Sequence, residues 1–479
     1  MPGNNNHSGP SNAVPLGITL RRGGRLTLAE QIHNEMQQAI ADGRLAAGAR
    51  LPSCRDLAVQ LGVARGTVRA AYDRLVDGQL LVSRGAAGTW VSGVPSLPAR
   101  VAPAAEAIAP LAEMVHAFDV PPLTFQMGAP ASDAFPAKVW SRIISRHARQ
   151  MASQPMGYAD PRGSPALRQQ LASYLAIARG MHCQPAQIVI TNGYAGALGL
   201  IVLGLRLAGQ QVWLENPGYL LARRALALAG VQGVPVPVDE QGICVGEGER
   251  LAPEARVALV TPGQHAPLGM TLSSSRRRAL LDWAHRQQGW IIEDDYLGEL
   301  QLQGRAAPAL AALDSERVLH VGTFSKNLSP TLRLGYLVVP EALAATFGEV
   351  AALLMPASSA VLHRAVAEFL HEGHFMRHLR RMKRLYAERL ALMLEALAPH
   401  FSQLSQAALS VVVDLPVGTR DTLIAREALS CGMAPSPLSM WYQENPAPRS
   451  GLVLSVTTLP RVGYAESALR LKQLVERFG

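Results

Sequence analysis

The sequence predicts an α/β protein with a small N-terminal winged helix-turn-helix domain and a large domain built on a mostly parallel sheet flanked by helices. Three observations support this prediction. Residues 21–92 hold short amphipathic helices, a glycine turn and a hairpin. Residues 93–119 are rich in Pro and Ala, as a linker is. From residue 120 onward, apolar runs alternate with helical patterns, which is typical of a doubly wound sheet.

Composition favours a soluble protein with an acidic partner. The 479 residues are 48% hydrophobic and carry a net charge of +9, which suits a polyanion. The four cysteines are scattered, so we expect free thiols in a reducing compartment. The N-terminus lacks the apolar core of a signal peptide, and the longest apolar run, 196–209, is too short to span a bilayer. These features predict a cytoplasmic protein without a membrane segment.

The N-terminal part begins with residues 1–20, rich in Asn, Ser, Gly and Pro, which predict a disordered segment. Apolar residues recur at helical spacing over 26–45 and predict the first helix. Ser53 is a suitable N-cap for a second helix that ends at Leu61, and a third helix follows from about Ala64. Two strands about a Gly-rich tip, within 80–92, complete the pattern of a wing.

Charge and side-chain placement in this part indicate DNA binding. The third helix carries Arg65, Thr67 and Arg69 on its first turns, where a recognition helix meets base edges and phosphates. Residues 21–100 hold 11 arginines against 6 acids, so +5 of the net +9 lies in a sixth of the chain. Clustered positive charge is what phosphate binding requires. The alternative is a small helical packing domain with a solvated basic face.

The stretch from Leu51 to Tyr72, LPSCRDLAVQLGVARGTVRAAY, resembles the winged helix-turn-helix of GntR-type bacterial regulators. The resemblance covers residues 26–92. It implies that the chain reads a double-stranded DNA operator. By this resemblance the expected DNA contacts are Ser53, Arg55, Arg65, Thr67, Arg69, and, in the wing, Arg84 and Gly88.

Lys326 is the residue around which the large domain is interpreted. It is one of only four lysines, and it follows the apolar run 317–321 and precedes a second one, 334–339. Among side chains, lysine is the one that forms a Schiff base with an aldehyde. A lysine between two buried strands is poorly placed to be an ordinary surface charge. The alternative is a loop lysine that reaches solvent.

A carboxylate partner for this lysine lies upstream. Residues 290–296, WIIEDDY, form an apolar strand that runs into three acids and a tyrosine. Pyridoxal phosphate (PLP) needs a lysine for its aldehyde and a carboxylate for its ring nitrogen, so the two stretches together predict this cofactor. A solvated acidic loop is one alternative and a metal site another. No His or Cys accompanies these acids at ligand spacing, and we therefore predict no metal.

Two further stretches suit parts of the same cofactor. Residues 188–198 read as a strand, a Gly-rich turn and a helix start, where backbone N–H groups bind phosphate. Residues 211–219 read as a strand that ends near Tyr219, which could stack on a flat ring or simply cap the next helix.

Several motifs of the large domain together resemble the fold-type-I aminotransferases, and in particular the MocR family of PLP-dependent regulators, in which such a domain is fused to a GntR domain. The motifs are Glu215-Asn-Pro-Gly-Tyr219, Ile292-Glu-Asp-Asp-Tyr296, the run from Gly322 to Arg333, and the run from Gly373 to Met382. The resemblance covers nearly all of residues 26–479. It implies an aminotransferase-like domain over 120–479, with a large part over about 120–340 and a smaller C-terminal α+β part over about 341–479.

The resemblance also assigns roles. It implies that Lys326 forms the Schiff base with PLP, that Asp294 pairs with the ring nitrogen and that Tyr296 binds the ring hydroxyl. The residues expected at the phosphate and on the ring face are Arg333, Gly193, Tyr194, Ala195, Thr323 or Ser325, and the stacking Tyr219. The basic helix that carries His374 and Arg377 is expected to be a solvated or interface face. A homodimer is implied as well, because winged helices read paired half-sites.

Three positions depart from the pattern of a working aminotransferase. Ala266 stands where these relatives carry Asn or an aromatic residue, so a cofactor contact is missing or rebuilt by His265. Leu297 and Gly298 replace polar residues. Leu452 aligns with the arginine that clamps an amino acid's α-carboxylate, and Arg449 is a possible substitute.

These observations favour a transcription regulator that senses an amino compound, or PLP itself, as its small-molecule effector, without turnover. The alternative is an active aminotransferase with an accessory DNA-binding domain, against which Leu452 counts. A regulator that no longer binds PLP is a third interpretation, and the retained Lys326, Asp294, Tyr296 and Arg333 argue against it. The operator, the effector and the sign of regulation are not predicted.

Overall fold

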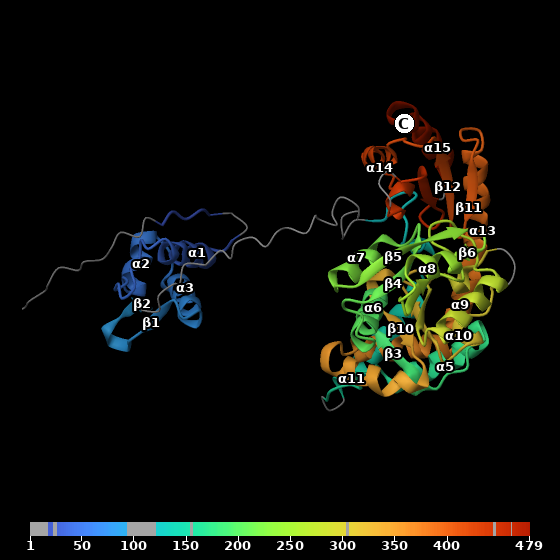
Figure 1. Cartoon of the computed structure of the whole chain (residues 1–479). Helices are drawn as coiled ribbons and strands as arrows, with labels where there is room; N and C mark the ends of the chain where they lie inside the picture. Colours follow the sequence, from blue (N-terminus) through green and yellow to red (C-terminus); the bar gives the residue numbers. More distant parts are fainter. Residues whose placement is uncertain are drawn as a thin grey trace, which may run out of the picture. The chain divides into compact units, whose positions relative to one another are not determined.

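The computed structural model describes residues 18–22, 26–92, 121–153, 157–302, 306–443, 447–460 and 462–479 (Figure 1). The chain divides into two compact units, with the boundary between Glu113 and Met114. The predicted disordered segment, 1–20, and the predicted linker, 93–119, lie outside the described residues except for Ile18, Thr19 and Leu20.

The N-terminal unit consists of three helices and a short hairpin. Its helices are α1 (Leu28–Ala41), α2 (Cys54–Leu61) and α3 (Arg65–Asp77), and its strands β1 (Leu81–Ser83) and β2 (Thr89–Val91) pair antiparallel. Thr27 and Glu30 form a capping box at the start of α1. Ser53 caps α2, and Gly62, at φ 61°, ends that helix in the left-handed region.

The core of this unit joins all three helices. Ile32 and Met36 of α1 meet Leu57 of α2 and Leu75 of α3, and all four are at most 1% exposed. The buried Tyr72 hydroxyl donates to the Pro52 carbonyl oxygen at 2.9 Å, which fastens α3 to the turn before α2. The exposed N-terminal end of α3 is thereby held in a fixed direction.

The second unit is built on an eight-stranded sheet with the order β3-β10-β9-β8-β7-β4-β5-β6. Strands β9, β8, β7, β4 and β5 are parallel, whereas β10 runs antiparallel to both of its neighbours. The strands are β3 (Ile188–Thr191), β4 (Gln211–Asn216), β5 (Gln232–Asp239), β6 (Gly242–Ile243), β7 (Val257–Val260), β8 (Trp290–Asp295), β9 (Val318–Thr323) and β10 (Gly335–Val338).

Helices cover both faces of this sheet. The helices are α4 (Ala137–Ala152), α5 (Pro165–Arg179), α6 (Gly193–Gly204), α7 (Leu220–Leu228), α8 (Val245–Leu251), α9 (Ser274–Arg286), α10 (Leu310–Leu313), α11 (Ala344–Leu354) and α12 (Ala360–His371). Side chains of α6, α7 and α11 form one buried cluster with Ile292 and Leu319. Those of α5, α9 and α12 form the other with Ile291 and Val318. This arrangement confirms the prediction of a mostly parallel sheet flanked by helices.

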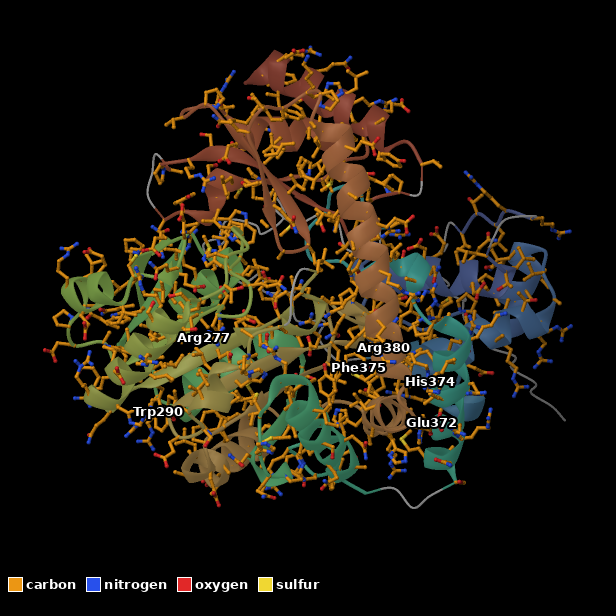
Figure 2. The ribbon with its side chains drawn as sticks, turned by 90° about the vertical axis from the view of Figure 1, so that its right-hand side faces the viewer. Arg277, Trp290, Glu372, His374, Phe375 and Arg380 are labelled. Atoms are coloured by element: carbon orange, nitrogen blue, oxygen red, sulfur yellow. The ribbon has the colours of Figure 1, made fainter. Side chains whose placement is uncertain are left out.

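The smaller C-terminal part is an α+β layer. Its four-stranded antiparallel sheet has the order β11-β12-β14-β13. The strands are β11 (Leu404–Ala407), β12 (Ser410–Leu415), β13 (Ser436–Pro437) and β14 (Ser450–Ser455), and the helices are α14 (Asp421–Leu429) and α15 (Tyr464–Phe478). The long helix α13 (His374–Leu397) runs from the region of the large sheet to this part (Figure 2). In the part of the chain that is described, no helix is both long and apolar enough to cross a membrane.

Candidate functional sites

Several predicted site residues meet at one edge of the large sheet. Strands β3, β8 and β9 run in the same direction and end at Thr191, Asp295 and Thr323. Because β10 is reversed, its beginning lies at this edge. The turn that follows β9 carries Lys326, and the residue at the end of the same connection is Arg333. Side chains from four strands therefore converge where α/β sheets commonly bind ligands.

Lys326 reaches across to a distant segment. Its Nζ donates to the Gly128 carbonyl oxygen at 3.0 Å. Burial lowers the pKa of this amine, and Arg333 lowers it further, against the opposing effect of Asp294. A lysine with a depressed pKa is a better nucleophile near neutral pH. The side chain is thus neither a surface charge nor a solvated loop residue.

Asp294 is a buried carboxyl with an unused oxygen. Its Oδ1 atom finds no hydrogen-bond partner among the described residues. Burial, followed by the charges of Asp295 and Glu215, raises its pKa to about 7, while Lys326 acts in the opposite sense. An unpaired buried carboxyl is costly, and it suits a cationic N–H group brought by a ligand.

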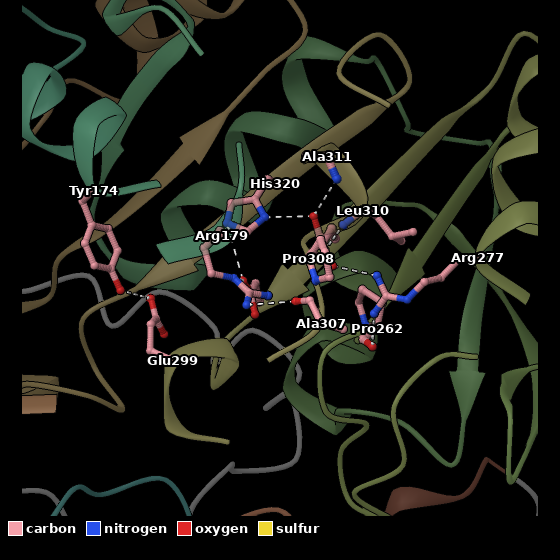
Figure 3. Close-up of polar contacts among 12 residues, drawn as sticks. Tyr174, Arg179, Pro262, Arg277, Glu299, Ala307, Pro308, Leu310, Ala311 and His320 are labelled. Atoms are coloured by element: carbon pink, nitrogen blue, oxygen red, sulfur yellow. Dashed lines mark hydrogen bonds and ion pairs between the residues drawn. The ribbon is translucent and has the colours of Figure 1, made fainter. Parts of the chain in front are cut away.

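The two neighbouring acids of β8 lie on the opposite face of the strand and are fully engaged there. Glu293 accepts from the Leu310 and Ala311 backbone N–H groups at 2.6 and 3.1 Å and bonds His320 Nδ1 at 2.9 Å (Figure 3). Asp295 Oδ2 lies 2.6 Å from Arg179 Nε, and both side chains are at most 4% exposed. Alternation along the strand thus assigns one acid to the site and two to the scaffold.

The same scaffold network fixes nearby loops. The Arg277 guanidinium donates to the carbonyl oxygens of Leu272, Pro308 and Pro262, all within 3.0 Å. Tyr174 donates to Glu299 Oε1 at 2.9 Å (Figure 3). These bonds brace the segments that follow β7 and β8 from behind the site.

Arg333 lies at the start of α6. Arg333 is in the left-handed region at φ 47°, and its Nη2 lies 3.5 Å from the Asn192 carbonyl oxygen. A Cβ atom added to Gly193 would lie 3.3 Å from that Nη2, and Gly193 has φ 71°. Side chain and helix start therefore lie together, with the first N–H groups of α6, which include those of Tyr194 and Ala195, free of helical partners. Thr323 and Ser325 are buried alongside, with Ser325 N donating to Thr323 Oγ1 at 3.1 Å.

Aromatic residues surround Asp294. Tyr194 and Tyr219 meet edge to face, with ring centroids 5.9 Å apart. Both line a small cavity with Asp294 and Glu215. The buried Tyr194 hydroxyl makes no hydrogen bond of ordinary geometry within the described residues. Burial, aided by the charge of Asp294, raises the pKa of the neighbouring Tyr296. Whether Tyr219 stacks on a ring stays a prediction.

His265 is committed to backbone groups. Its Nε2 lies 3.0 Å from the Pro217 carbonyl oxygen, and its Nδ1 accepts from Leu268 N at 3.4 Å. Burial lowers its pKa to about 4, so the ring is neutral near pH 7. The imidazole ties two loops beside the site together, and its predicted contact with a cofactor stays a prediction.

Strand β14, which aligns with the strand that carries the carboxylate clamp in aminotransferases, has apolar side chains at its centre. Leu452 is buried in the core cluster that also holds Val411 and Val413, on the face of β14 that the α-helices cover. Val453 points to the other face, in a cluster with Leu438 to which Met127, Leu268 and Tyr442 pack. No arginine stands at either position. Arg449, the possible substitute, pairs with Asp414 at 2.5 Å.

The basic start of α13 has both buried and exposed residues. Phe375 packs against Tyr174 and Phe324, whereas His374 bonds Glu372 Oε2 at 2.9 Å (Figure 2). The exposed basic side chains include Arg377, Arg380, Arg381 and Arg384. They lie outside the site, as a solvated or interface face would.

The N-terminal unit presents a basic surface at its second and third helices. Arg55, Arg65 and Arg69 are exposed on the first turns of α2 and α3, and Thr67 is half-buried between the latter two. Ser53 is exposed but also serves as the α2 cap, since it accepts from Asp56 N at 3.2 Å. The first turns of the two helices therefore offer three cations to a phosphate backbone.

The hairpin adds a further cation. Arg84 lies over the Trp90 ring, with its guanidinium carbon 5.6 Å from the ring centroid, and Arg50 lies at 5.8 Å. Gly88 has φ 106°, which residues with a Cβ atom rarely adopt, and a Cβ atom there would lie 3.2 Å from Arg50 Nε. The assignment of these residues to DNA stays a prediction.

The sequence did not point to Gly128 or Arg179. Gly128 contributes a backbone carbonyl oxygen 198 positions from Lys326, so no side-chain pattern marks it. The one available signal was the Gly-Ala-Pro turn, in which Gly128 takes φ 87°. Arg179 ends helix α5, and its partner Asp295 is 116 residues away in the sequence.

Comparison with known families gives two matches. Residues 28–91 match the model of bacterial regulatory proteins of the gntR family, and residues 126–430 match aminotransferase class I and II. The chain is 35% identical over 453 residues, 91% of each chain, to a probable rhizopine catabolism regulatory protein, MocR, of Rhizobium meliloti. It is 30% identical to PdxR, the pyridoxine biosynthesis transcriptional regulator of Corynebacterium glutamicum, over 78% of this chain and 79% of the relative.

Solved structures resemble the second unit. An archaeal alanine:glyoxylate aminotransferase superposes with a TM-score of 0.68 at 25% identity, covering 75% of this chain and 91% of the other. LysN, the α-aminoadipate aminotransferase of Thermus thermophilus, superposes with a TM-score of 0.66 at 27% identity, covering 74% and 92%, and was solved with N-(5'-phosphopyridoxyl)-L-leucine.

Proposed function

The chain belongs to the MocR-type transcriptional regulators of the GntR family, which join a helix-turn-helix domain to an aminotransferase domain, and we propose that it binds PLP at Lys326 and uses the occupied site to sense an amine. The regulator reads DNA through its N-terminal unit. The second unit acts as the sensor, without the turnover of the enzymes that share its fold.

The residues of the site fit this cofactor. When bound, PLP supplies an aldehyde that bonds a primary amine reversibly and a ring that withdraws electrons. Lys326 offers the amine, already depressed in pKa by burial. Asp294 offers an unpartnered carboxylate oxygen to the ring N–H group, and Arg333 with the start of α6 offers an anion corner to the phosphate.

The observation that carries the proposal is the unsatisfied Oδ1 of Asp294 at the same sheet edge as Lys326. Native structures rarely leave a buried carboxyl unpaired without a functional reason. Glu293 and Asp295, one residue to either side, are paired within the fold. The chain therefore has the partners to neutralise a carboxyl here and leaves this one for a ligand.

DNA binding would use the first turns of α2 and α3 and the hairpin. We assign Arg65, Thr67 and Arg69 to the major groove and its phosphates, with Ser53 and Arg55 on the backbone. Arg84 and Gly88 form the part of the wing that approaches the DNA. Two copies of the chain would read paired half-sites, and effector binding would change how the two readers are spaced.

The test of the cofactor assignment is the visible absorption of the purified protein after incubation with PLP. We expect a band that disappears in Lys326→Ala and persists in Lys138→Ala, which removes an exposed lysine of α4. Borohydride reduction followed by peptide mapping should place the phosphopyridoxyl group on Lys326. Absence of the band, or its persistence in Lys326→Ala, would refute the assignment.

An active aminotransferase is the alternative, because the lysine, the aspartate and the arginine of such enzymes are present here. Incubation of the PLP-loaded protein with amino acids and 2-oxoglutarate distinguishes the two. We expect no sustained formation of glutamate. Many turnovers per site would favour the enzyme.

A further inference from the structure

We propose that the effector is a primary amine whose amine-bearing carbon carries no carboxylate. This inference rests on the proposed function, since it concerns the ligand that meets the PLP-loaded site at Lys326. Four observations lead to it: the placement of Arg333, the pairing of Arg449, the side chains on the site face of β14, and the segment that contacts Lys326.

The cation nearest to Lys326 is already placed elsewhere. Asp294 and Arg333 are the charged groups that shift the pKa of Lys326. Arg333 lies at the α6 start, 3.5 Å from the Asn192 carbonyl oxygen and in contact distance of Gly193. In the proposed function that corner takes the phosphate. Within the described residues, the immediate surroundings of Lys326 then hold no free cation for a second anion.

Arg449 is held away by an ion pair. Its Nη2 lies 2.5 Å and its Nε 3.2 Å from Asp414 Oδ1 on the neighbouring strand β12. A guanidinium that binds one carboxylate through two nitrogens cannot bind a second carboxylate with the same two nitrogens. A ligand carboxylate would have to displace Asp414, which would leave that acid without its partner.

The side of β14 that faces the site is apolar. Val453 is fully buried in a cluster with Leu438, and Leu268, Met127 and Tyr442 pack against it. Leu268 and Met127 are half-buried at the edge of this cluster. Leu268 lies three residues after His265, in the loop that His265 braces.

The apolar wall formed by Val453, Leu268 and Met127 is connected to Lys326 through the backbone of Gly128. Met127 precedes Gly128, whose carbonyl oxygen accepts from Lys326 Nζ. The segment that carries them is fastened to the strand β14 region, because Phe125 O accepts from Ser455 N at 3.0 Å and Ala129 O accepts from Thr457 Oγ1 at 2.5 Å. On this side, a ligand amine that takes the place of the Lys326 amine therefore meets the apolar side chains of Met127 and Leu268 beside its first carbon.

An α-carboxylate there would lose its water and gain no charged partner, whereas a hydrogen or alkyl group would gain contact area. We expect each amine to act at concentrations at least ~10-fold lower than the amino acid from which it derives by loss of the carboxylate. The substituent itself can be apolar or hydroxylated.

The test is a titration of the full-length, PLP-loaded protein followed by its visible absorption. The probes are matched pairs: 3-methylbutylamine against L-leucine, tyramine against L-tyrosine, and ethylamine against L-alanine. An amine response at ~10-fold lower concentration than that of its amino acid supports the proposal. Equal responses, a preference for the amino acids, or no response to any amine overturns it. Failure of the proposed function is distinguishable, because the protein would then show no PLP band before any probe is added.

Two sets of variants sharpen the result. Leu268→Arg places a cation on the apolar wall, and we expect it to improve the amino-acid response ~10-fold. Leu281→Arg, at a similarly half-buried leucine of α9, is the matched control and should leave both responses unchanged. Arg449→Gln should also leave both unchanged. If it weakened the amino-acid response, Arg449 would be a clamp and the proposal would be wrong.

Discussion

The two faces of strand β8 treat adjacent carboxyls in opposite ways. On one face Glu293 is bound to His320 and to two backbone N–H groups, and Asp295 is bound to Arg179. On the other face Asp294 keeps an oxygen without a partner. All three side chains are at most 7% exposed, so burial alone does not account for the difference.

The comparison separates charges that hold the fold from the charge that serves the ligand. Burial raises the pKa of Glu293, but His320 and the backbone donors lower it more, and the result is below the usual range. Burial, followed by the charges of Asp295 and Glu215, raises the pKa of Asp294 to about 7, and the opposing effect of Lys326 and Tyr194 is smaller. A strand that alternates every residue can therefore carry a rigid ionic scaffold and a reactive site back to back.

The largest effect should come from breaking the scaffold face. Asp295→Ala leaves Arg179 charged, buried and without its 2.6 Å partner. We expect a loss of ~3–5 kcal/mol in the free energy of unfolding, measured by urea denaturation of the cofactor-free protein. The control is Glu466→Ala, which removes the exposed pair with Arg470 and should cost at most ~0.5 kcal/mol. Equal losses would mean that the scaffold pair is no more than a surface pair.

Asp294→Asn should have the opposite sign. The folded pKa of about 7 lies above the ordinary 3.8, so charging this carboxyl penalises the folded state increasingly as pH rises between these values. At about pH 8 the amide should therefore stabilise the cofactor-free protein by up to ~4 kcal/mol, and near pH 4 by almost nothing. The same variant should lose affinity for PLP in the absorption assay. Destabilisation at the higher pH would contradict the comparison.

Two buried histidines, His265 and His320, should affect the stability of the protein differently at low pH. Burial lowers the pKa of His265 to about 4, so its contribution to stability is lost as pH falls from about 6.5 toward 4. Burial also lowers the pKa of His320, but Glu293 and Asp295 raise it more, and the result is above the usual value. We expect His265→Gln to flatten the fall in stability over that range by up to ~3 kcal/mol, as read from thermal unfolding at several pH values. An unchanged profile would show that the pKa of this ring is not lowered in the fold.

The smallest change in the free energy of unfolding is expected on removal of a hydroxyl from Tyr174 or Tyr194. Tyr174→Phe deletes a hydroxyl that donates to Glu299 at 2.9 Å, and we expect a cost of ~1–2 kcal/mol. Tyr194→Phe deletes a buried hydroxyl that lies beside Asp294 but makes no hydrogen bond of ordinary geometry within the described residues, and the change should lie within ~0.5 kcal/mol of zero. Urea unfolding measures both. A larger loss at Tyr194 would indicate that its hydroxyl is bonded in the cofactor-free protein.

Much of the fold could be predicted because local signals agree with it. Helix α5 shows such signals, since Pro165 starts the helix and Gly180 ends it in the left-handed region. Helix α1 was predicted over 26–45 but spans Leu28–Ala41, because the Thr27 capping box sets its start and the chain turns at Asp42 and Gly43.

The site was less accessible to sequence reasoning. Lys326 and Asp294 were marked by their residue types and by the strands beside them, and alternation along β8 could have separated Asp294 from its neighbours. The placement of Val453 on the face opposite Leu452 depends on which side of β14 the helices cover, which only the packed structure reveals. The Gly128 contact with Lys326 depends on a backbone atom far away in the chain, and residue type cannot encode it.

Because strand β10 runs antiparallel to β9, the connection between them should tolerate few insertions or deletions. Surface connections usually tolerate insertions and deletions. The connection from β9 to β10, residues 324–334, is held at both ends, where Thr323 pairs with Gly335 and Phe324 N donates to Leu334 O at 3.0 Å. It carries both Lys326 and Arg333, so one added or missing codon would shift the amine and the guanidinium relative to each other. Across descendants of this gene, length should be far more constant in this connection than in an exposed surface turn such as residues 416–418.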